Sequence, residues 1–209
     1  MNDVSATIYT FLLMLSVSFS PVRREKRYSE TDVWFDQLVL NVLIAYLGEG
    51  SGGVRFGSPA SGDRPTSFPD AVKWLAGLLG LSEGAGDPAP AVKDGGVDIV
   101  VWKQFADRRS SFLIVLAQVT AQEDWRSKFG DLLLKRWHGW IDFGADPVTA
   151  LAIPFAVSLD WERWDDLRRA TTLLLDRLRL CEYAKGEQFA QLVEVADWVE
   201  QERQRMTLN

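Results

Sequence analysis

Apolar residues in the first 80 positions recur mostly with the spacing of α-helices. Residues 6–19 form a long apolar run that predicts a buried helix or packing arm. Between residues 32 and 47, two adjacent apolar stripes predict a second helix with a wide buried face. A third helix is expected over residues 69–79, where Gly80 is a typical stop. The Gly-, Ser- and Pro-rich segment between these helices contains only a short strand candidate, residues 54–56.

The middle of the chain changes to the pattern of a β-hairpin. Residues 97–102 and 112–119 are β-branched and apolar, and a polar connection separates them. Both runs are apolar on both faces, so the strands are expected in a sheet that is covered on each side. Thr120 and Glu123 have the spacing of a capping box, which predicts a helix continuing to about Trp140.

The last third combines one more strand candidate with helical spacing. A strand is expected from Ala150, and Pro154 would place it at a sheet edge or a bulge. Apolar residues between positions 161 and 181 recur at spacings of three and four, as do those from 189 to 199. These two segments are predicted to form an antiparallel helix pair that docks on the sheet.

These patterns predict an α/β (α+β) protein built from three segments. Its 209 residues suffice for one large domain or for one domain with a helical extension. We expect an N-terminal helix or arm over residues 1–28, a sheet-containing core over residues 29–158, and a C-terminal helical extension over residues 159–209.

Composition and charge narrow the classes of function. The net charge of −6 argues against a protein that coats nucleic acid with one basic face, although local basic patches exist. A single cysteine, Cys181, excludes an intramolecular disulfide and is typical of a reducing compartment. With His138 as the only histidine, neither a zinc site nor a Cys–His dyad is expected.

The apolar run near the N-terminus is similar to the core of a signal peptide. It lacks the basic leader, because Asp3 is the only charge before it, and it is too short to span a bilayer. We therefore interpret it as a buried helix and expect a cytoplasmic protein that does not associate with membranes.

Polar side chains interrupt the apolar hairpin at Asp98 and Gln118. If Trp102 faces Phe112, Asp98 lies opposite Leu116, and Gln118 becomes its diagonal neighbour on the same face. Such neighbours lie roughly 7–8 Å apart at the backbone, which allows two side chains to share one cation.

This hairpin resembles a known family. The stretches "DGGVDIVVW" and "LIVLAQVT" resemble the central hairpin of the PD-(D/E)xK nuclease superfamily, and the Asp-Gly-Gly-Val-Asp opening is similar to Mrr-type restriction endonucleases. The resemblance covers about residues 30–157 and implies a restriction-endonuclease-like αβββαβ core. It also implies hydrolysis of DNA phosphodiesters with Mg²⁺ or Mn²⁺, because a bound metal polarises the phosphate and activates water.

The resemblance also implies roles for individual residues. Asp98 matches the metal-binding Asp, and Gln118 matches the Glu or Gln that completes the metal site. Thr120 stands where the family has its lysine, and Lys128 is the candidate to replace that lysine from the following helix. Asp36 matches the acidic residue on the first core helix, for which Glu30 is a substitute.

Each candidate also has a structural interpretation. Asp98 can be a strand-end residue that bonds the glycine turn, and Gln118 can satisfy buried backbone groups. Lys128 can extend past Trp125 to solvent, and Asp36 can be a carboxylate on the helix surface.

Three hypotheses of function follow. The first is a metal-dependent deoxyribonuclease in restriction or antiviral defence, with Arg126, Lys135 and Arg136 as contacts for nucleic acid. The second is a catalytically degenerate nuclease fold that serves as a scaffold or interaction module. The third is an adaptor dominated by the C-terminal helix pair, in which the sheet is only structural. A protein partner or a second copy is expected to bind the C-terminal helices.

Overall fold

The computed structural model describes residues 4–17, 30–90, 92–157, 161–184 and 189–207. The helices are α1 (Val4–Ser16), α2 (Glu30–Leu47), α3 (Phe68–Leu79), the 3₁₀ helix η2 (Trp125–Gly130), α4 (Leu134–Trp140), α5 (Trp161–Ala170), α6 (Arg177–Tyr183) and α7 (Leu192–Thr207). The strands are β1 (Ser51–Arg55), β2 (Ser82–Glu83), β3 (Ile99–Lys103), β4 (Leu113–Val119), β5 (Ile141–Asp142), β6 (Val148–Ala152) and β7 (Leu173–Leu175).

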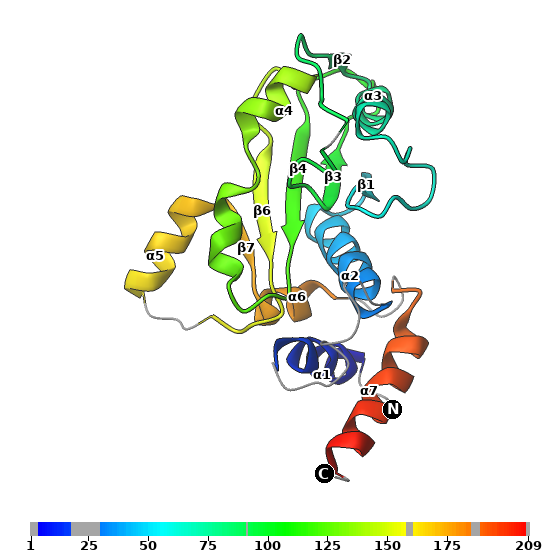
Figure 1. Ribbon diagram of the computed structural model, residues 1–209, viewed down its shortest axis with the longest axis vertical. Coiled ribbons are helices and arrows are strands. Elements are labelled where there is room, and N and C mark those ends of the chain that lie inside the picture. Colours follow the sequence, from blue (N-terminus) through cyan, green and yellow to red (C-terminus); the bar gives the residue numbers. More distant parts are fainter. Residues whose placement is uncertain (1–3, 18–29, 91, 158–160, 185–188, 208–209) are drawn as a thin grey trace.

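A mixed five-stranded sheet forms the centre of the fold (Figure 1). Its strand order is β1-β3-β4-β6-β7, with β1, β3 and β4 antiparallel and with β6 and β7 parallel to their neighbours. The order α2, β1, β3, β4, α4, β6 agrees with the αβββαβ order expected for the core, and α3 is inserted between β1 and β3. The prediction of an α/β fold is confirmed.

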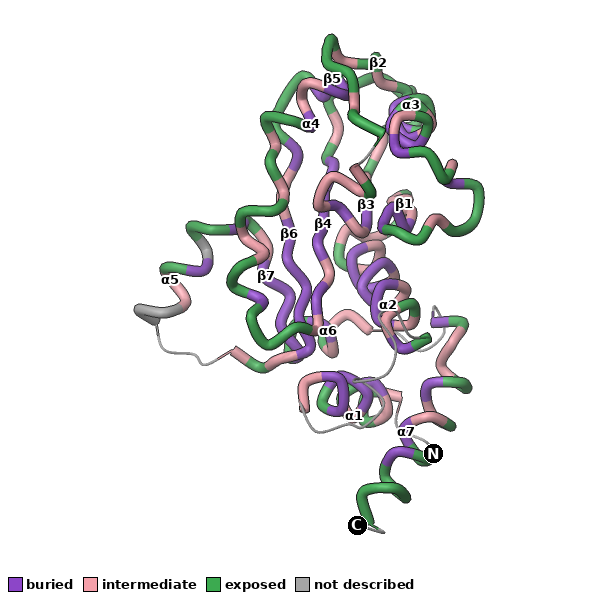
Figure 2. Tube along the Cα trace, in the orientation of Figure 1, coloured by how far each residue is buried: buried purple, intermediate pink, exposed green. Residues whose placement is uncertain are grey.

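Apolar side chains cover both faces of the sheet, as predicted for its central strands. Ile99 and Ala117 belong to one buried cluster, while Val100 and Leu116 belong to another. Figure 2 shows β3, β4 and β6 buried along most of their length between the helices. Each central strand is therefore buried on both sides, which explains its lack of polar alternation.

Two sets of helices make these clusters. On one face, α1, α2, α6 and α7 bury residues such as Phe11, Leu43 and Leu180. On the other face, α3 and α4 pack an aromatic group over β3 and β4, while η2 and α5 cover β6 and β7. The aromatic group consists of Phe56, Phe68, Trp137 and Trp140.

The helix predicted from Thr120 to Trp140 is wrong as a single element. The chain instead forms the short helices η2 and α4, separated by residues 131–133. Trp125 packs in the cluster over β6 and β7, whereas Trp137 packs in the aromatic group over β3 and β4. A break between the two helices lets each tryptophan reach its own cluster.

The long helix predicted between residues 161 and 181 is also wrong. It is divided into α5 and α6 by β7, which pairs in parallel with β6 as the fifth strand. Leu174 and Leu175 are buried in clusters on opposite faces of the sheet, as expected for neighbouring strand residues. Asp176 then caps α6 by accepting a hydrogen bond from the Arg179 amide at 3.1 Å.

Two smaller expectations also need correction. Pro154 was expected to place its strand at an edge or bulge, but β6 lies between β4 and β7 and ends at Ala152, before the proline. The C-terminal helix α7 packs on α1 instead of pairing with α6, and the Phe11 and Trp198 rings meet edge-on at 5.7 Å. Figure 1 shows α1 and α7 together at one end of the sheet. The last two residues of the apolar run predicted over residues 6–19 lie outside the described residues.

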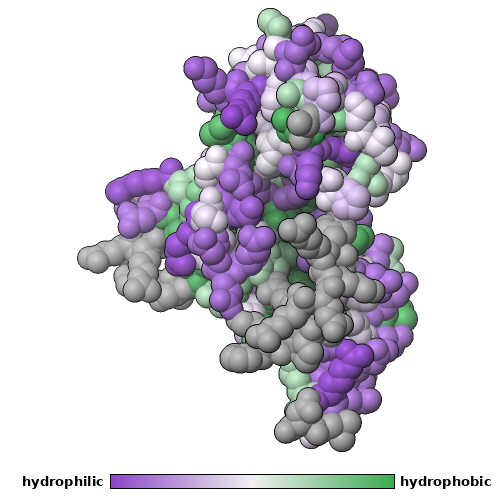
Figure 3. Space-filling model, in the orientation of Figure 1, coloured by the Kyte–Doolittle hydropathy of each residue, from purple (hydrophilic) through white to green (hydrophobic). Residues whose placement is uncertain are grey.

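The surface carries scattered apolar side chains. Among the coloured atoms of Figure 3, hydrophilic residues predominate, with apolar ones between them. Isolated apolar residues on a surface are normal for a globular protein. No helix in the described ranges is both long and apolar enough to cross a bilayer.

Close packing of β1 against α2 and β3 gives a test of the fold. A Cβ atom at Gly53 would lie 2.6 Å from Val101 Cγ1 and 2.7 Å from Leu40 Cδ1. We expect Gly53→Ala to lower the free energy of unfolding by about 1–3 kcal/mol through overpacking, measured by denaturant unfolding.

The matched control is Gly77→Ala in α3, where an added Cβ meets nothing within 4 Å. That variant should gain about 1 kcal/mol because alanine favours a helix over glycine. Equal stability of both variants would contradict the packing described for β1.

Candidate active site

The β3–β4 hairpin brings Asp98 and Gln118 to the lining of one cavity. The observed pairs include Ile99 with Ala117 and Trp102 with Ile114, so the predicted pairing of Trp102 with Phe112 is wrong by two residues. An even shift keeps each side chain on its expected face. Asp98 lies just before β3, outside the paired residues, and its amide donates to the Ala117 carbonyl instead of pairing with Gln118.

The turn before β3 joins this hairpin end to the segment after η2. Asp94 Oδ1 accepts a hydrogen bond from the Gly96 amide at 3.0 Å, and Gly95 and Gly96 have φ of +63° and +77°. A Cβ at Gly96 would lie 2.6 Å from the Asp131 carbonyl oxygen, so this turn touches backbone directly. Glycine is required there both for its conformation and for this close approach.

Three backbone contacts fix Asp98. The amides of Phe56 and Gly57 donate to its carbonyl oxygen at 2.7 and 2.8 Å, and its own amide donates to the Ala117 carbonyl at 2.9 Å. Its side-chain Oδ2 accepts a hydrogen bond from the Val119 amide at 2.8 Å. The carboxylate therefore occupies one defined position at the end of the hairpin.

The surroundings of Asp98 disfavour its negative charge. Burial raises the pKa of the Asp98 carboxyl to about 7, and the nearby carboxylates of Asp36 and Asp94 add to the rise. The hydrogen bond from Val119 and the charge of Arg55 oppose the rise in this pKa. Asp98 thus titrates near neutral pH, where a cation or a proton can occupy the site.

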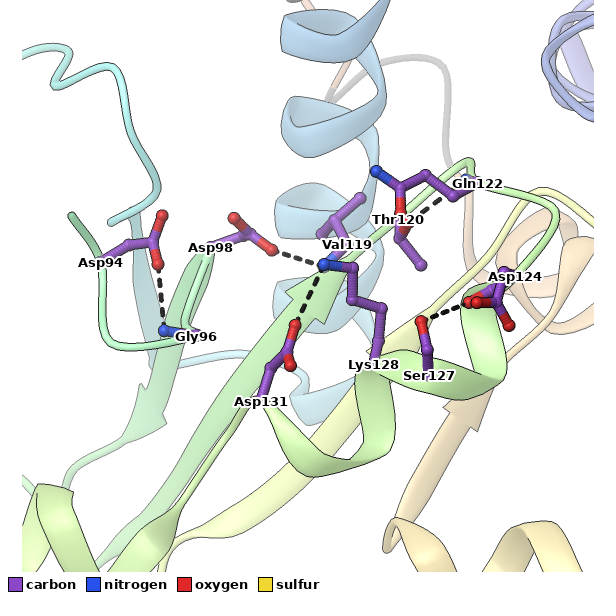
Figure 4. Close-up of polar contacts among 10 residues, drawn as sticks. All are labelled: Asp94, Gly96, Asp98, Val119, Thr120, Gln122, Asp124, Ser127, Lys128 and Asp131. Carbon is purple, nitrogen blue, oxygen red and sulfur yellow. Dashed lines mark hydrogen bonds and ion pairs between the residues drawn. The ribbon is translucent and has the colours of Figure 1, made fainter. Parts of the chain in front are cut away.

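Asp98, Gln118 and Lys128 line a single cavity of about 190 Å³. Figure 4 shows the polar contacts around it, with Asp98, Thr120 and Lys128 contributed by different segments. The structure therefore brings together three of the residues singled out from the sequence. The described lining residues are Asp94, Gly96, Asp98, Gln118, Val119, Thr120, Gln122, Lys128 and Asp131.

Thr120 occupies a buried position at the end of β4. Its amide donates to the Ala152 carbonyl at 3.0 Å, and its hydroxyl accepts a hydrogen bond from the Gln122 amide at 3.2 Å. The expected capping box with Glu123 is therefore replaced by a tight turn. A threonine here supplies no positive charge to the cavity.

Lys128 reaches the cavity from η2, although the long apolar helix expected to carry it does not form. Its Nζ lies 3.0 Å from Asp131 Oδ2, and the two side chains are 32% and 47% exposed. Asp131 follows η2 directly, and its amide donates to the Lys128 carbonyl at 3.0 Å. The Lys128 ammonium therefore already has a carboxylate partner.

Asp36 lies in α2 and does not line the cavity. It is buried and forms an ion pair with Arg55, whose Nε lies 2.8 Å from Asp36 Oδ2. Arg55 also donates to the Pro59 carbonyl and to Ser61 Oγ. Asp36 acts on the cavity through its charge, by raising the pKa of Asp98.

The basic residues predicted to contact nucleic acid are exposed but lie outside the cavity lining. The Arg126 guanidinium lies 4.2 Å from the centroid of the Trp125 ring, while Lys135 and Arg136 are on α4. His138 on α4 contacts Asp146 at 2.7 Å. Contact with nucleic acid stays a prediction for these side chains.

Asp131 and Gly57 belong to the site but are not predicted by the sequence pattern. A Cβ at Gly57 would lie 2.9 Å from Asp98 Oδ1, so this glycine leaves room for the carboxylate. The spacing of Lys128 and Asp131, three residues apart, was the available signal for their ion pair. No sequence signal pairs Gly57 with Asp98, because the contact depends on how β1 meets the hairpin.

The oxygen atoms of Asp98 and Gln118 suit a site for a hydrated metal ion. Within the described part of the chain, no group of three or more His, Cys, Asp or Glu residues is arranged to hold a metal ion. Asp98 and Gln118 do offer oxygen atoms, which Mg²⁺ prefers. Because Mg²⁺ commonly keeps several waters and uses one or two carboxylates with substrate phosphates, these donors fit a hydrated ion rather than a closed cage.

No family model matches the chain, and no curated protein is similar to it. Among solved structures, the chain is similar to one described as "MspJI Restriction Endonuclease in Complex with 27-mer Oligonucleotide", at 12% sequence identity and a TM-score of 0.32. The match covers 89% of this chain and 38% of that chain. Similarity at this level establishes neither activity nor partner.

The raised pKa of Asp98 predicts a pH-dependent effect of Asp98→Asn. The folded state binds the Asp98 proton more tightly than the unfolded chain, whose carboxyl has a pKa of about 3.9, so wild-type stability falls as pH rises from about 4 to about 7. The Asn carbonyl can accept the Val119 hydrogen bond without titrating. The melting temperature of Asp98→Asn relative to wild type should therefore increase between pH 5 and pH 8.

Thermal unfolding at several pH values measures this difference, with about 2–4 °C expected for each kcal/mol. Asp63→Asn, at an exposed loop position, serves as the control and should show no such trend. A constant difference for Asp98→Asn across this pH range would contradict the electrostatic description of the cavity.

Proposed function

We propose that this chain is a Mg²⁺- or Mn²⁺-dependent nuclease of the PD-(D/E)xK superfamily that hydrolyses DNA phosphodiesters. The observation that carries the proposal is the shared cavity of Asp98, Gln118 and Lys128. An acid, an amide and an ammonium in one cavity are suited to bind a hydrated cation together with a phosphate.

Different residues of the cavity would bind the metal ion and the phosphate. Asp98 and Gln118 would hold the metal, which when bound polarises the phosphate and lowers the pKa of its water. The Val119 amide keeps the Asp98 carboxylate in place. Lys128 would neutralise the negative charge that increases on the phosphate during hydrolysis. Since Asp98 titrates near pH 7, metal binding should strengthen as pH rises through this value.

Contacts beyond the cavity would be local and electrostatic. Arg126, Lys135 and Arg136 are exposed and would contact the phosphate backbone, in a chain whose net charge is −6. Such a chain is suited to act beside a partner protein, with the C-terminal helices as the expected docking elements. The resemblance of the hairpin supports a role for this activity in restriction or antiviral defence.

A degenerate nuclease fold that acts as an interaction subunit is the second candidate. Two observations favour it: Thr120 at the lysine position, and the engagement of Lys128 by Asp131. A site whose lysine is already paired with a carboxylate can be retained for its shape alone.

Metal-dependent cleavage tests the first candidate. We expect wild-type protein to cleave plasmid or oligonucleotide DNA in Mn²⁺ or Mg²⁺, and Asp98→Ala to reduce the rate at least about 100-fold, as loss of a metal ligand does. Calorimetric titration with Mn²⁺ should show binding to wild type that Asp98→Ala loses. Asp63→Asn is the control and should keep both properties.

Two results of this test would contradict the proposed active site. Cleavage that survives Asp98→Ala would reject the assignment of the site. A folded wild-type protein that neither binds Mn²⁺ nor cleaves any DNA tested would favour the interaction subunit.

The position of the lysine can be tested by moving it. We expect Lys128→Ala to reduce cleavage by about 10–1,000-fold, because it removes a cation near the reacting phosphate. Thr120→Lys in the same chain should restore part of the rate, since the long side chain can extend from position 120 into the cavity that Thr120 lines. Unaltered turnover in Lys128→Ala would show that Lys128 is not the replacement.

A further inference from the structure

The ion pair between Lys128 and Asp131 lies on the wall of the cavity. Both side chains line it together with Asp98, and Lys128 Nζ is 3.0 Å from Asp131 Oδ2. Both side chains are also partly exposed, so water screens their attraction and the pair can exchange partners at small cost. The Lys128 side chain is therefore held in place, but it can still bind another anion.

Asp131 is itself fixed by backbone contacts on two sides. Its amide donates to the Lys128 carbonyl at 3.0 Å, which ends η2. Its carbonyl oxygen packs against Gly96, where an added Cβ would come within 2.6 Å. Gly96 belongs to the turn that leads into Asp98. The backbone of Asp131 therefore has a fixed position relative to Asp98.

The Lys128 side chain needs such an anchor. Lysine has four rotatable carbons and a strongly hydrated ammonium, and without a partner this group would sample solvent. Asp131 limits that freedom on the cavity side. The Asp131 carboxylate also neutralises the Lys128 ammonium, which is the group that an incoming phosphate would bind.

We propose that Asp131 is a positioning residue: its carboxylate is an exchangeable counter-ion that holds the Lys128 ammonium at the cavity. A phosphate group of the nucleic acid displaces the Asp131 carboxylate and takes over the ammonium. This inference rests on the proposed function for its catalytic consequence, whereas the ion exchange itself requires no metal and no cleavage.

Chemical labelling of lysines tests the holding role directly. An amine-directed ester is applied to the folded full-length chain, and the rate at Lys128 is measured by mass spectrometry relative to the exposed Lys135. Asp131→Asn should raise the relative rate at Lys128 by roughly two- to five-fold, the size expected for a half-exposed ion pair. Asp131→Glu should stay near the wild-type rate.

The control variant is Asp107→Asn, which removes the exposed contact of Asp107 with Arg109 in the connection between β3 and β4, at the other end of the hairpin. It should leave labelling of Lys128 unchanged. An unchanged rate at Lys128 in Asp131→Asn would overturn the holding role.

The exchange with phosphate is tested with a 12-residue oligothymidylate in metal-free buffer as the probe. It should protect Lys128 from labelling in wild type, and half-protection should need less oligonucleotide in Asp131→Asn, because no carboxylate competes. Absence of protection in both proteins, or a higher requirement in Asp131→Asn, would overturn the exchange.

Kinetics separate positioning from a merely structural role. Asp131→Asn should lower KM for DNA, since the phosphate meets less competition, and should also lower kcat, since Lys128 is less well placed. Asp131→Glu should recover part of kcat. A kcat equal to wild type in Asp131→Asn would overturn the positioning role. Failure of Asp98→Ala to affect cleavage would reject the proposed active site alone, because labelling and protection are read without metal.

Discussion

A carboxylate placed at the end of an apolar hairpin is the constraint on which the candidate site depends. Asp98 follows a turn that is pressed against backbone, and it is fixed by hydrogen bonds from Phe56, Gly57 and Val119. Burial and the neighbouring acids raise the pKa of this carboxyl to about 7. The fold thus maintains an acid whose charge is costly unless a proton or a cation accompanies it.

The helices on both faces of the sheet keep that arrangement rigid. On one face α2 carries Asp36, whose ion pair with Arg55 is buried beside the hairpin. On the other, the break between η2 and α4 lets Trp125 and Trp137 enter separate clusters, and the segment at the break carries Asp131 to the turn at Gly96. Packing of large rings therefore decides where the charged groups of the cavity lie.

Charge balance separates the two candidate functions. Asp94, Asp98 and Asp131 face one lysine in the cavity, so the described lining carries more acidic than basic groups when all are ionised. Such a site attracts a cation, and a cation in turn attracts phosphate, which is the logic of a metal-dependent nuclease. If no metal ion binds, Lys128 is the one basic side chain among the described residues that line the cavity, and the cavity is then only a remnant on an interaction module.

The sequence alone determined the α/β class and the apolar hairpin, because apolar spacing along an element depends on local geometry. It also predicted that Asp98 and Gln118 lie near each other, and both line one cavity. It did not determine the hairpin register, the break after η2, or the strand formed by Leu173–Leu175. Three leucines satisfy helical and strand spacing equally well, and only a free sheet edge beside β6 selects the strand. The pairing of Lys128 with Asp131 and the space that Gly57 leaves for Asp98 were likewise decided in three dimensions, since these contacts join segments whose approach is set by packing of the whole core.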